Sequence, residues 1–172
     1  MQMVKRTVGG FILLLIFLWI FAPKQEIYYL MEKELAKNGI VIANEKFEEG
    51  LFGMKISDAE IYFEGIQVAK VKSLSLNLFF LYNQAVISSV VTDKGIQNFA
   101  PKSIDKITAT YSILKPYKIA IEGRGSFGSI IGGVYLNRHK LLLRFKHIKE
   151  IRSFKKFLKK DKKGLYYEKS YQ

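Results

Sequence analysis

Hydrophobic and polar residues alternate with a period of two through most of residues 40–146. The clearest case is Ser73–Phe80, a stretch of eight residues. Leu74, Leu76, Leu78 and Phe80 face one way, and the other face carries Ser73, Ser75, Asn77 and Phe79. Such alternation is typical of a strand with one buried face. Short turns separate the successive segments, and none of the intervening residues shows helical periodicity. The pattern therefore predicts a mainly β domain of roughly eight or nine short strands. We expect a curved antiparallel sheet, either an open barrel or taco-like.

Helical periodicity replaces the alternation on both sides of this region. Residues 24–39 predict a short amphipathic helix that ends at Asn38-Gly39, two residues that tolerate the left-handed conformation. Within residues 147–172, apolar residues recur at helical spacing from Ile148 to Leu158, and lysine and arginine occupy the other positions. The sequence therefore predicts a basic C-terminal helix followed by a tail.

Val8–Ala22 is the longest uninterrupted apolar run of the chain. Together with the residues before it, the run reaches about 20 residues, enough for a hydrocarbon core of roughly 30 Å. Lys5 and Arg6 precede it, and Trp19 would lie near the far interface. A cleaved signal peptide is the alternative, but bulky Phe21 lies beside the only plausible cleavage position. We therefore expect an uncleaved transmembrane anchor.

The short basic head before the run favours an N-terminus in the cytoplasm. This predicts a single-pass protein of a bacterial inner membrane, with the bulk of the chain in the periplasm. The alternative is a domain on the cytoplasmic side, where the basic tail would meet nucleic acid or anionic lipid. The predicted parts are a transmembrane anchor at 1–23, an amphipathic helix at 24–39, a β-rich domain at 40–146, and a basic helix and tail at 147–172.

Charge is concentrated at the C-terminal end. The 172 residues carry a formal net charge of +13 and no cysteine, which excludes disulfides, thiol nucleophiles and thiolate metal sites. A basic helix with apolar positions suits an anionic membrane surface. A solvated helix packed on the sheet end explains the same pattern, and no nucleic-acid partner is expected beyond an inner membrane. The candidates for membrane-surface contact are Lys149, Arg152, Lys155, Lys156 and Lys159.

Motifs for catalysis or cofactor binding lack their required context. Gly123–Gly128 matches the glycine spacing of dinucleotide-binding loops, but the residues that follow are a poor helix. His139 and His147 would need a third ligand to hold a metal. We expect no enzyme activity, no cofactor and no metal.

Some predicted strands carry large apolar residues on both faces, as in Ile61-Tyr62-Phe63. A sheet with one solvated face does not need this pattern. The sheet either folds into a compact sandwich or curls around an apolar groove that accepts acyl chains. The candidates for lining such a lipid groove are Ile61, Phe63, Leu74, Leu76, Leu78 and Phe80.

The order of these parts resembles type II secretion system protein N and the related AsmA-like bacterial envelope proteins. The resemblance lies in the apolar N-terminal run, the helix Ile27–Asn38, the run Gly50–Phe80 and the glycine-rich segment Gly123–Asn137. It implies an inner-membrane protein with a periplasmic taco-like domain that binds or passes membrane lipid in envelope biogenesis. The alternative is a non-catalytic structural or interaction component of a type II secretion-like envelope assembly, with other envelope or secretion proteins as partners.

Overall fold

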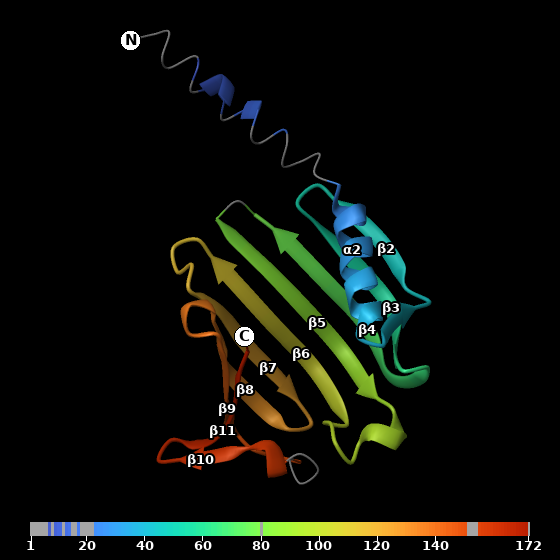
Figure 1. Cartoon of the computed structure of the whole chain (residues 1–172), viewed down its shortest axis with the longest axis vertical. Helices are drawn as coiled ribbons and strands as arrows, with labels where there is room; N and C mark the ends of the chain where they lie inside the picture. Colours follow the sequence, from blue (N-terminus) through green and yellow to red (C-terminus); the bar gives the residue numbers. More distant parts are fainter. Residues whose placement is uncertain are drawn as a thin grey trace.

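The computed structural model describes residues 7, 9–11, 13–14, 17, 23–79, 81–150 and 155–171. Within these residues, eleven strands form one antiparallel sheet, and the helix α2 (Lys24–Lys37) lies against it (Figure 1). The strands are β1 (Ile40–Ala43), β2 (Lys46–Gly50), β3 (Gly53–Phe63), β4 (Ile66–Leu78), β5 (Tyr82–Thr92), β6 (Ser103–Ser112), β7 (Lys118–Gly125), β8 (Gly128–Tyr135), β9 (Lys140–Lys146), β10 (Lys159–Asp161) and β11 (Gly164–Ser170). Three single-turn 3₁₀ helices, η1 (Lys94–Ile96), η2 (Leu136–Arg138) and η3 (Lys155–Phe157), lie between strands.

The sheet is open, with the order β1-β3-β4-β5-β6-β7-β8-β9-β11-β10, and β2 pairs with the first half of β3. The prediction of a mainly β, open antiparallel sheet is confirmed, and the alternative of a two-sheet sandwich is not observed in the described chain. The predicted strand count and lengths were wrong, because β3, β4 and β5 have 11, 13 and 11 residues.

A line of residues that are left out of the strand pairing crosses four neighbouring strands. It explains why each long strand has the sequence pattern of two short strands. The strand pairing skips Asp58, Lys72, Ser89 and Asp105 on β3 to β6. Asp58 and Ser89 have φ values of 59° and 54°, in the left-handed region. The side-chain alternation inverts at this line, which we call the bend line, so each strand continues where its sequence pattern breaks.

The helix α2 lies within the predicted range 24–39 and packs on the sheet through Tyr28, whose side chain is 1% exposed. The Tyr28 ring lies 5.5 Å from the Phe47 ring, and its hydroxyl donates a hydrogen bond to Glu45 at 3.1 Å. At the start of the helix, buried Lys24 forms a 3.2 Å ion pair with Glu49 of β2. Burial and the nearby Glu45 carboxylate raise the pKa of Tyr28.

The predicted transmembrane anchor requires correction. Much of Val8–Ala22, namely residues 8, 12, 15–16 and 18–22, lies outside the described residues. In the part of the chain that the structure describes, no helix has the length and apolar character needed to cross a bilayer. The 14 residues of α2 extend only about 21 Å and include several lysines and glutamates. The placement as a single-pass inner-membrane protein with a periplasmic domain is therefore not supported.

The predicted basic C-terminal helix is also wrong. After β9, the backbone N–H groups of Lys149 and Glu150 donate to the carbonyl oxygens of Phe127 and Ser126 on the β7–β8 turn, so these residues are bonded to the sheet end. The three-residue η3 and the hairpin β10–β11 follow. Residues 151–154, including Arg152, lie outside the described residues. Helical spacing misled here because tertiary contacts with the sheet overrode local periodicity.

Candidate functional site: an apolar face of the sheet

One face of the sheet, which we call the inner face, is apolar across eight strands. Two rows of directly paired residues run across it and contain only aliphatic, aromatic, methionine or glycine residues. The first row is Met54, Leu76, Ala85, Ala109, Ile121, Gly132, Leu143 and Tyr167. The second row is Ile56, Leu74, Ile87, Ile107, Gly123, Ile130 and Phe145. Paired residues in an antiparallel ladder project to the same side, so the rows form one continuous apolar surface.

The opposite face, the outer face, is mainly polar. The neighbouring row on that side is Ser57, Ser73, Ser88, Lys106, Arg124, Ser129 and Lys146. An antiparallel sheet with one apolar and one polar face normally buries the apolar one. The composition of the two faces therefore identifies the inner face as the surface that needs a cover.

The described chain covers only part of the inner face. Tyr28 of α2 packs on Met54 and Ile56, which are buried, at the β3 end of the rows. From β5 onward most members of both rows are only half-buried, for example Ile107, Ile121 and Leu143. Figure 1 shows the same arrangement, with α2 in front of β3 and β4 and away from β6 to β9. The middle of the inner face is thus apolar and accessible.

The sheet curls at the end that holds the β7–β8 turn, which is the lower end in Figure 1. Ile104 of β6 and Leu165 of β11 both pack against the buried pair Phe127 and Ile130. In a flat sheet, four strand spacings would separate β6 from β11 by about 19 Å. Curvature therefore brings distant strands around one apolar cluster.

An apolar cavity of about 160 Å³ lies beside this cluster. Its lining residues are Pro101, Ile104, Ile107, Phe127, Ile130 and Phe145. Gly123 lies between Ile107 and Ile130 in the second row, and a Cβ atom there would come within 3.1 Å of both side chains. The side chains of Ile107 and Ile130 thus occupy the space that a side chain at Gly123 would need.

The structure places four of the six predicted lipid-groove residues on the inner face, mostly at its covered end. Ile61, Leu74 and Leu76 pack against the core that Tyr28 closes, and Leu78 follows on the same side of β4. Phe63 lies at the end of β3, paired with Ile40. Phe80 lies outside the described residues. These residues remain candidates, but the more accessible surface belongs to β6–β9.

Sequence reasoning missed the accessible members on β6 to β9, among them Ile107, Ile121 and Leu143. Each belongs to an alternating or apolar segment that is visible in the sequence. Their common row, however, depends on the register between strands, which single-segment patterns do not reveal. The signal was present strand by strand, and only strand pairing assembles it into one surface.

The predicted membrane-surface lysines do not share a helix face. Lys149 follows β9, Lys155 and Lys156 lie in η3, and Lys159 begins the edge strand β10. All four are exposed, and the Lys156 ammonium lies 5.2 Å from the Phe99 ring centroid. They lie at the end of the sheet that holds the β7–β8 turn. Their contact with a membrane stays a prediction.

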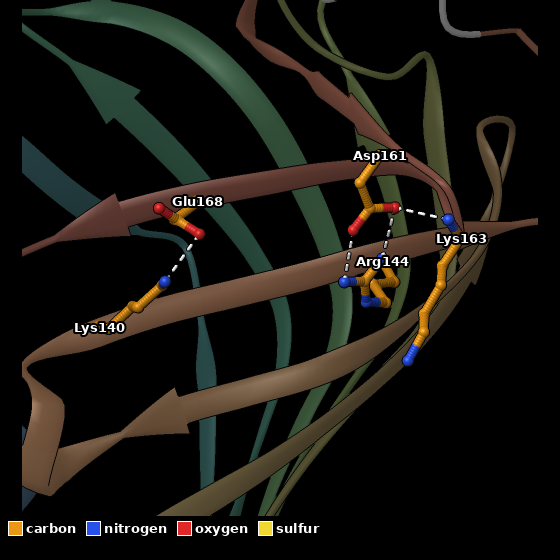
Figure 2. Close-up of polar contacts among 5 residues, drawn as sticks. All are labelled: Lys140, Arg144, Asp161, Lys163 and Glu168. Carbon is orange, nitrogen blue, oxygen red and sulfur yellow. Dashed lines mark hydrogen bonds and ion pairs between the residues drawn. The ribbon is translucent and has the colours of Figure 1, made fainter.

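Ion pairs on the outer face attach the C-terminal hairpin β10–β11 to β9 (Figure 2). The Arg144 guanidinium donates to both carboxylate oxygens of Asp161, at 3.0 and 2.8 Å, and the Lys163 backbone N–H donates to Asp161 as well. Lys140 pairs with Glu168 at 2.7 Å. These contacts lower the pKa of both carboxyl groups, through Arg144 for Asp161 and through Lys140 for Glu168.

A second polar cluster joins the opposite edge of the sheet. Glu60 accepts hydrogen bonds from Lys70 at 2.7 Å, from Asn44 at 2.8 Å and from Tyr62 at 3.0 Å. These donors lower the pKa of Glu60 to about 2. Both clusters tie neighbouring strands together and lie away from the inner face, which indicates a structural role.

The glycine motif Gly123–Gly128 forms the β7–β8 hairpin, with Gly125 paired to Gly128 across a two-residue turn. No helix begins there, so the geometry of a dinucleotide-binding loop is missing. Among the described residues, no group of three or more histidine, aspartate or glutamate side chains could hold a metal ion.

Comparison with protein family models, curated proteins and solved structures finds no match to this chain.

Proposed function

We propose that this protein binds or passes lipid, with acyl chains lying on the uncovered part of the inner face. One observation carries the proposal: two apolar rows run across the sheet, and α2 covers only their β3 end. Apolar surface of this extent favours an apolar ligand, because its burial is worth about 25 cal/mol per Å².

The chemistry of the rows favours acyl chains over a polypeptide. A bound peptide strand or loop would bring backbone N–H and C=O groups that need hydrogen-bond partners once buried. The two inner rows offer no such partner on β6 to β8, where they consist of Ala109, Ile107, Ile121, Ile130 and glycine. An acyl chain has no hydrogen-bonding groups and leaves none unsatisfied.

The proposal is tested with a pair of variants on adjacent residues of β6. Ala109→Asp puts a carboxylate on the inner face, and Thr110→Asp puts the same group on the outer face. Native mass spectrometry of the full chain after mild detergent extraction should detect phospholipid on the unaltered protein and on Thr110→Asp. We expect the lipid to be absent from Ala109→Asp, and circular dichroism checks that both variants fold.

A second pair guards against misfolding of the first. Ile121→Asn and Ala120→Asn place the same neutral polar group on the inner and outer faces of β7. Equal lipid retention in both members of a folded pair would contradict the proposal. A lipid-free protein that recovers defined partner proteins would instead favour the alternative, an interaction component of an envelope or secretion assembly.

A further inference from the structure

The turns at one end of the sheet carry large apolar side chains in place of the usual polar ones. This end, uppermost in Figure 1, contains the turns β2–β3, β4–β5, β6–β7 and β8–β9. We call their exposed apolar residues the apolar rim. They are Leu51, Phe52, Phe79, Leu81, Ile113, Leu114, Tyr117 and Leu136.

Backbone hydrogen bonds join these turns side by side. The Leu78 N–H donates to Phe52 at 2.6 Å, the Ile113 N–H donates to Leu81 at 3.1 Å, and the Leu136 N–H donates to Tyr117 at 2.9 Å. The first bond links the first two turns, and the other two extend the contact to the third and fourth. The rim is therefore one continuous strip held by the sheet.

Its exposure is unusual for residues of this size. Leu114 is 84% exposed at the tip of the β6–β7 turn, and Tyr117 in the same turn is 66% exposed. Single exposed apolar residues are common on protein surfaces, but a contiguous strip marks an interaction site. The rim needs a partner that accepts aliphatic and aromatic side chains together.

The charge of the rim identifies the chemistry of that partner. In its described turns, residues 51–52, 79, 81, 113–117 and 136–139, the charged side chains are the exposed Lys115 and Arg138, and there is no carboxylate. The opposite end carries both signs, because the acidic Glu64, Asp93 and Glu150 lie in its turns and connections together with the basic Lys94, Lys102 and Lys149. Apolar and aromatic groups mixed with cations alone match the boundary between headgroups and acyl chains of an anionic bilayer.

We infer that the apolar rim docks on an anionic membrane surface, with Leu114 and its neighbours inserted among the headgroups. The strands run away from the rim, so docking would place one end of the inner face at the bilayer. This inference goes beyond the proposed function, because the rim belongs to the turns and a protein can dock without carrying lipid. Its failure would leave lipid binding on the inner face untouched.

The first test measures flotation of the full chain with vesicles of phosphatidylcholine alone or mixed with phosphatidylglycerol. We expect Leu114→Ser to weaken binding about tenfold or more, since burying a leucine is worth about 1.5–3 kcal/mol. Lys115→Gln should weaken binding about fivefold, and only to the anionic vesicles. Ile66→Ser is the matched control, because Ile66 is 68% exposed at the opposite end and should have no effect.

A second experiment measures how deeply the rim enters the bilayer, and its result does not depend on how much the rest of the chain contributes to vesicle affinity. In a Trp19→Phe background, tryptophan is introduced as Leu114→Trp or as Ile66→Trp, and vesicles with brominated acyl chains quench any indole that enters the bilayer. We expect quenching at position 114 and none at position 66. Quenching at position 66 alone, or at neither position, would overturn the inference.

Two further outcomes would assign the surface differently. If Lys155→Gln and Lys156→Gln abolish vesicle binding while Leu114→Ser does not, the basic connection before β10 is the membrane contact. If Leu114→Ser converts a dimer into a monomer in sedimentation and leaves vesicle binding unchanged, the rim is an interface between two copies of this chain. Either result would refute docking through the rim.

Discussion

Tyr28 is the side chain through which α2 closes one end of the inner face, and removing it should unfold the protein at much lower denaturant concentration. Its ring is fully buried against Phe47 and the β3 core, so Tyr28→Ala leaves a cavity as large as those of other aromatic-to-alanine changes. Such changes reduce the free energy of unfolding by about 3–5 kcal/mol. With a urea m-value of about 2 kcal/mol/M, the midpoint should fall by about 1.5–2.5 M.

Tyr28→Phe separates packing from hydrogen bonding at the same site. This change keeps the ring and removes only the hydroxyl that donates to Glu45, so we expect a loss of about 1 kcal/mol and a midpoint shift of about 0.5 M. The assay is urea unfolding followed by circular dichroism at neutral pH. Equal midpoints for Tyr28→Ala and the unaltered protein would refute the packing of α2 on the sheet.

The raised pKa of Tyr28 adds a test at alkaline pH. Because the folded state keeps this hydroxyl protonated above its ordinary pKa of 10.0, the unfolded state releases its proton first as the pH rises. The stability that Tyr28 contributes is thus complete below pH 10 and decreases above it. Tyr28→Phe should show a smaller alkaline loss of stability than the unaltered protein, and identical pH profiles would contradict this reasoning.

Two further predictions concern the sheet away from α2. The lowered pKa values of Asp161 and Glu168 stabilise the folded state above their ordinary values of 3.8 and 4.5, and this contribution is lost as the pH falls below them. Thermal unfolding should show a smaller acid-induced fall in Tm for Arg144→Gln than for the unaltered protein; an equal fall would contradict the role of the Arg144 pair. Gly132→Ala should prevent folding or strongly lower Tm, because the new Cβ would overlap a β9 carbonyl oxygen, whereas Gly50→Ala has room and should lower Tm little.

Local pattern predicted the elements of this fold better than it predicted where they break. The alternation around Leu74 and Leu76 correctly indicated a strand with one apolar face. Asp58 lies inside β3 on the bend line, where a left-handed residue inverts the alternation without ending the pairing. A local sequence signal cannot distinguish a bulge from a turn, because both interrupt the period of two.

The tail and the face illustrate the larger limit. Ile148 and Leu158 fall at helical spacing, but the backbone between β9 and β10 bonds to the β7–β8 turn, a contact more than 20 residues distant in sequence. The candidate surface likewise depends on register: Ala109, Ile121 and Leu143 share one row only after several strands have paired. Segment patterns predict which residues are apolar, whereas non-local pairing decides which of them lie together.

The strand order has a consequence for how the molecule responds to stress. From β4 to β8 each strand pairs only with the strands before and after it in the chain, so stability passes from neighbour to neighbour as in a linear array. Only the β3 end has the additional cover of α2. Under partial denaturation the sheet should therefore fray from the β10–β11 edge, and amide exchange should slow progressively toward β3 and β4. Such a molecule can lose part of its width while the strands beneath α2 keep their register.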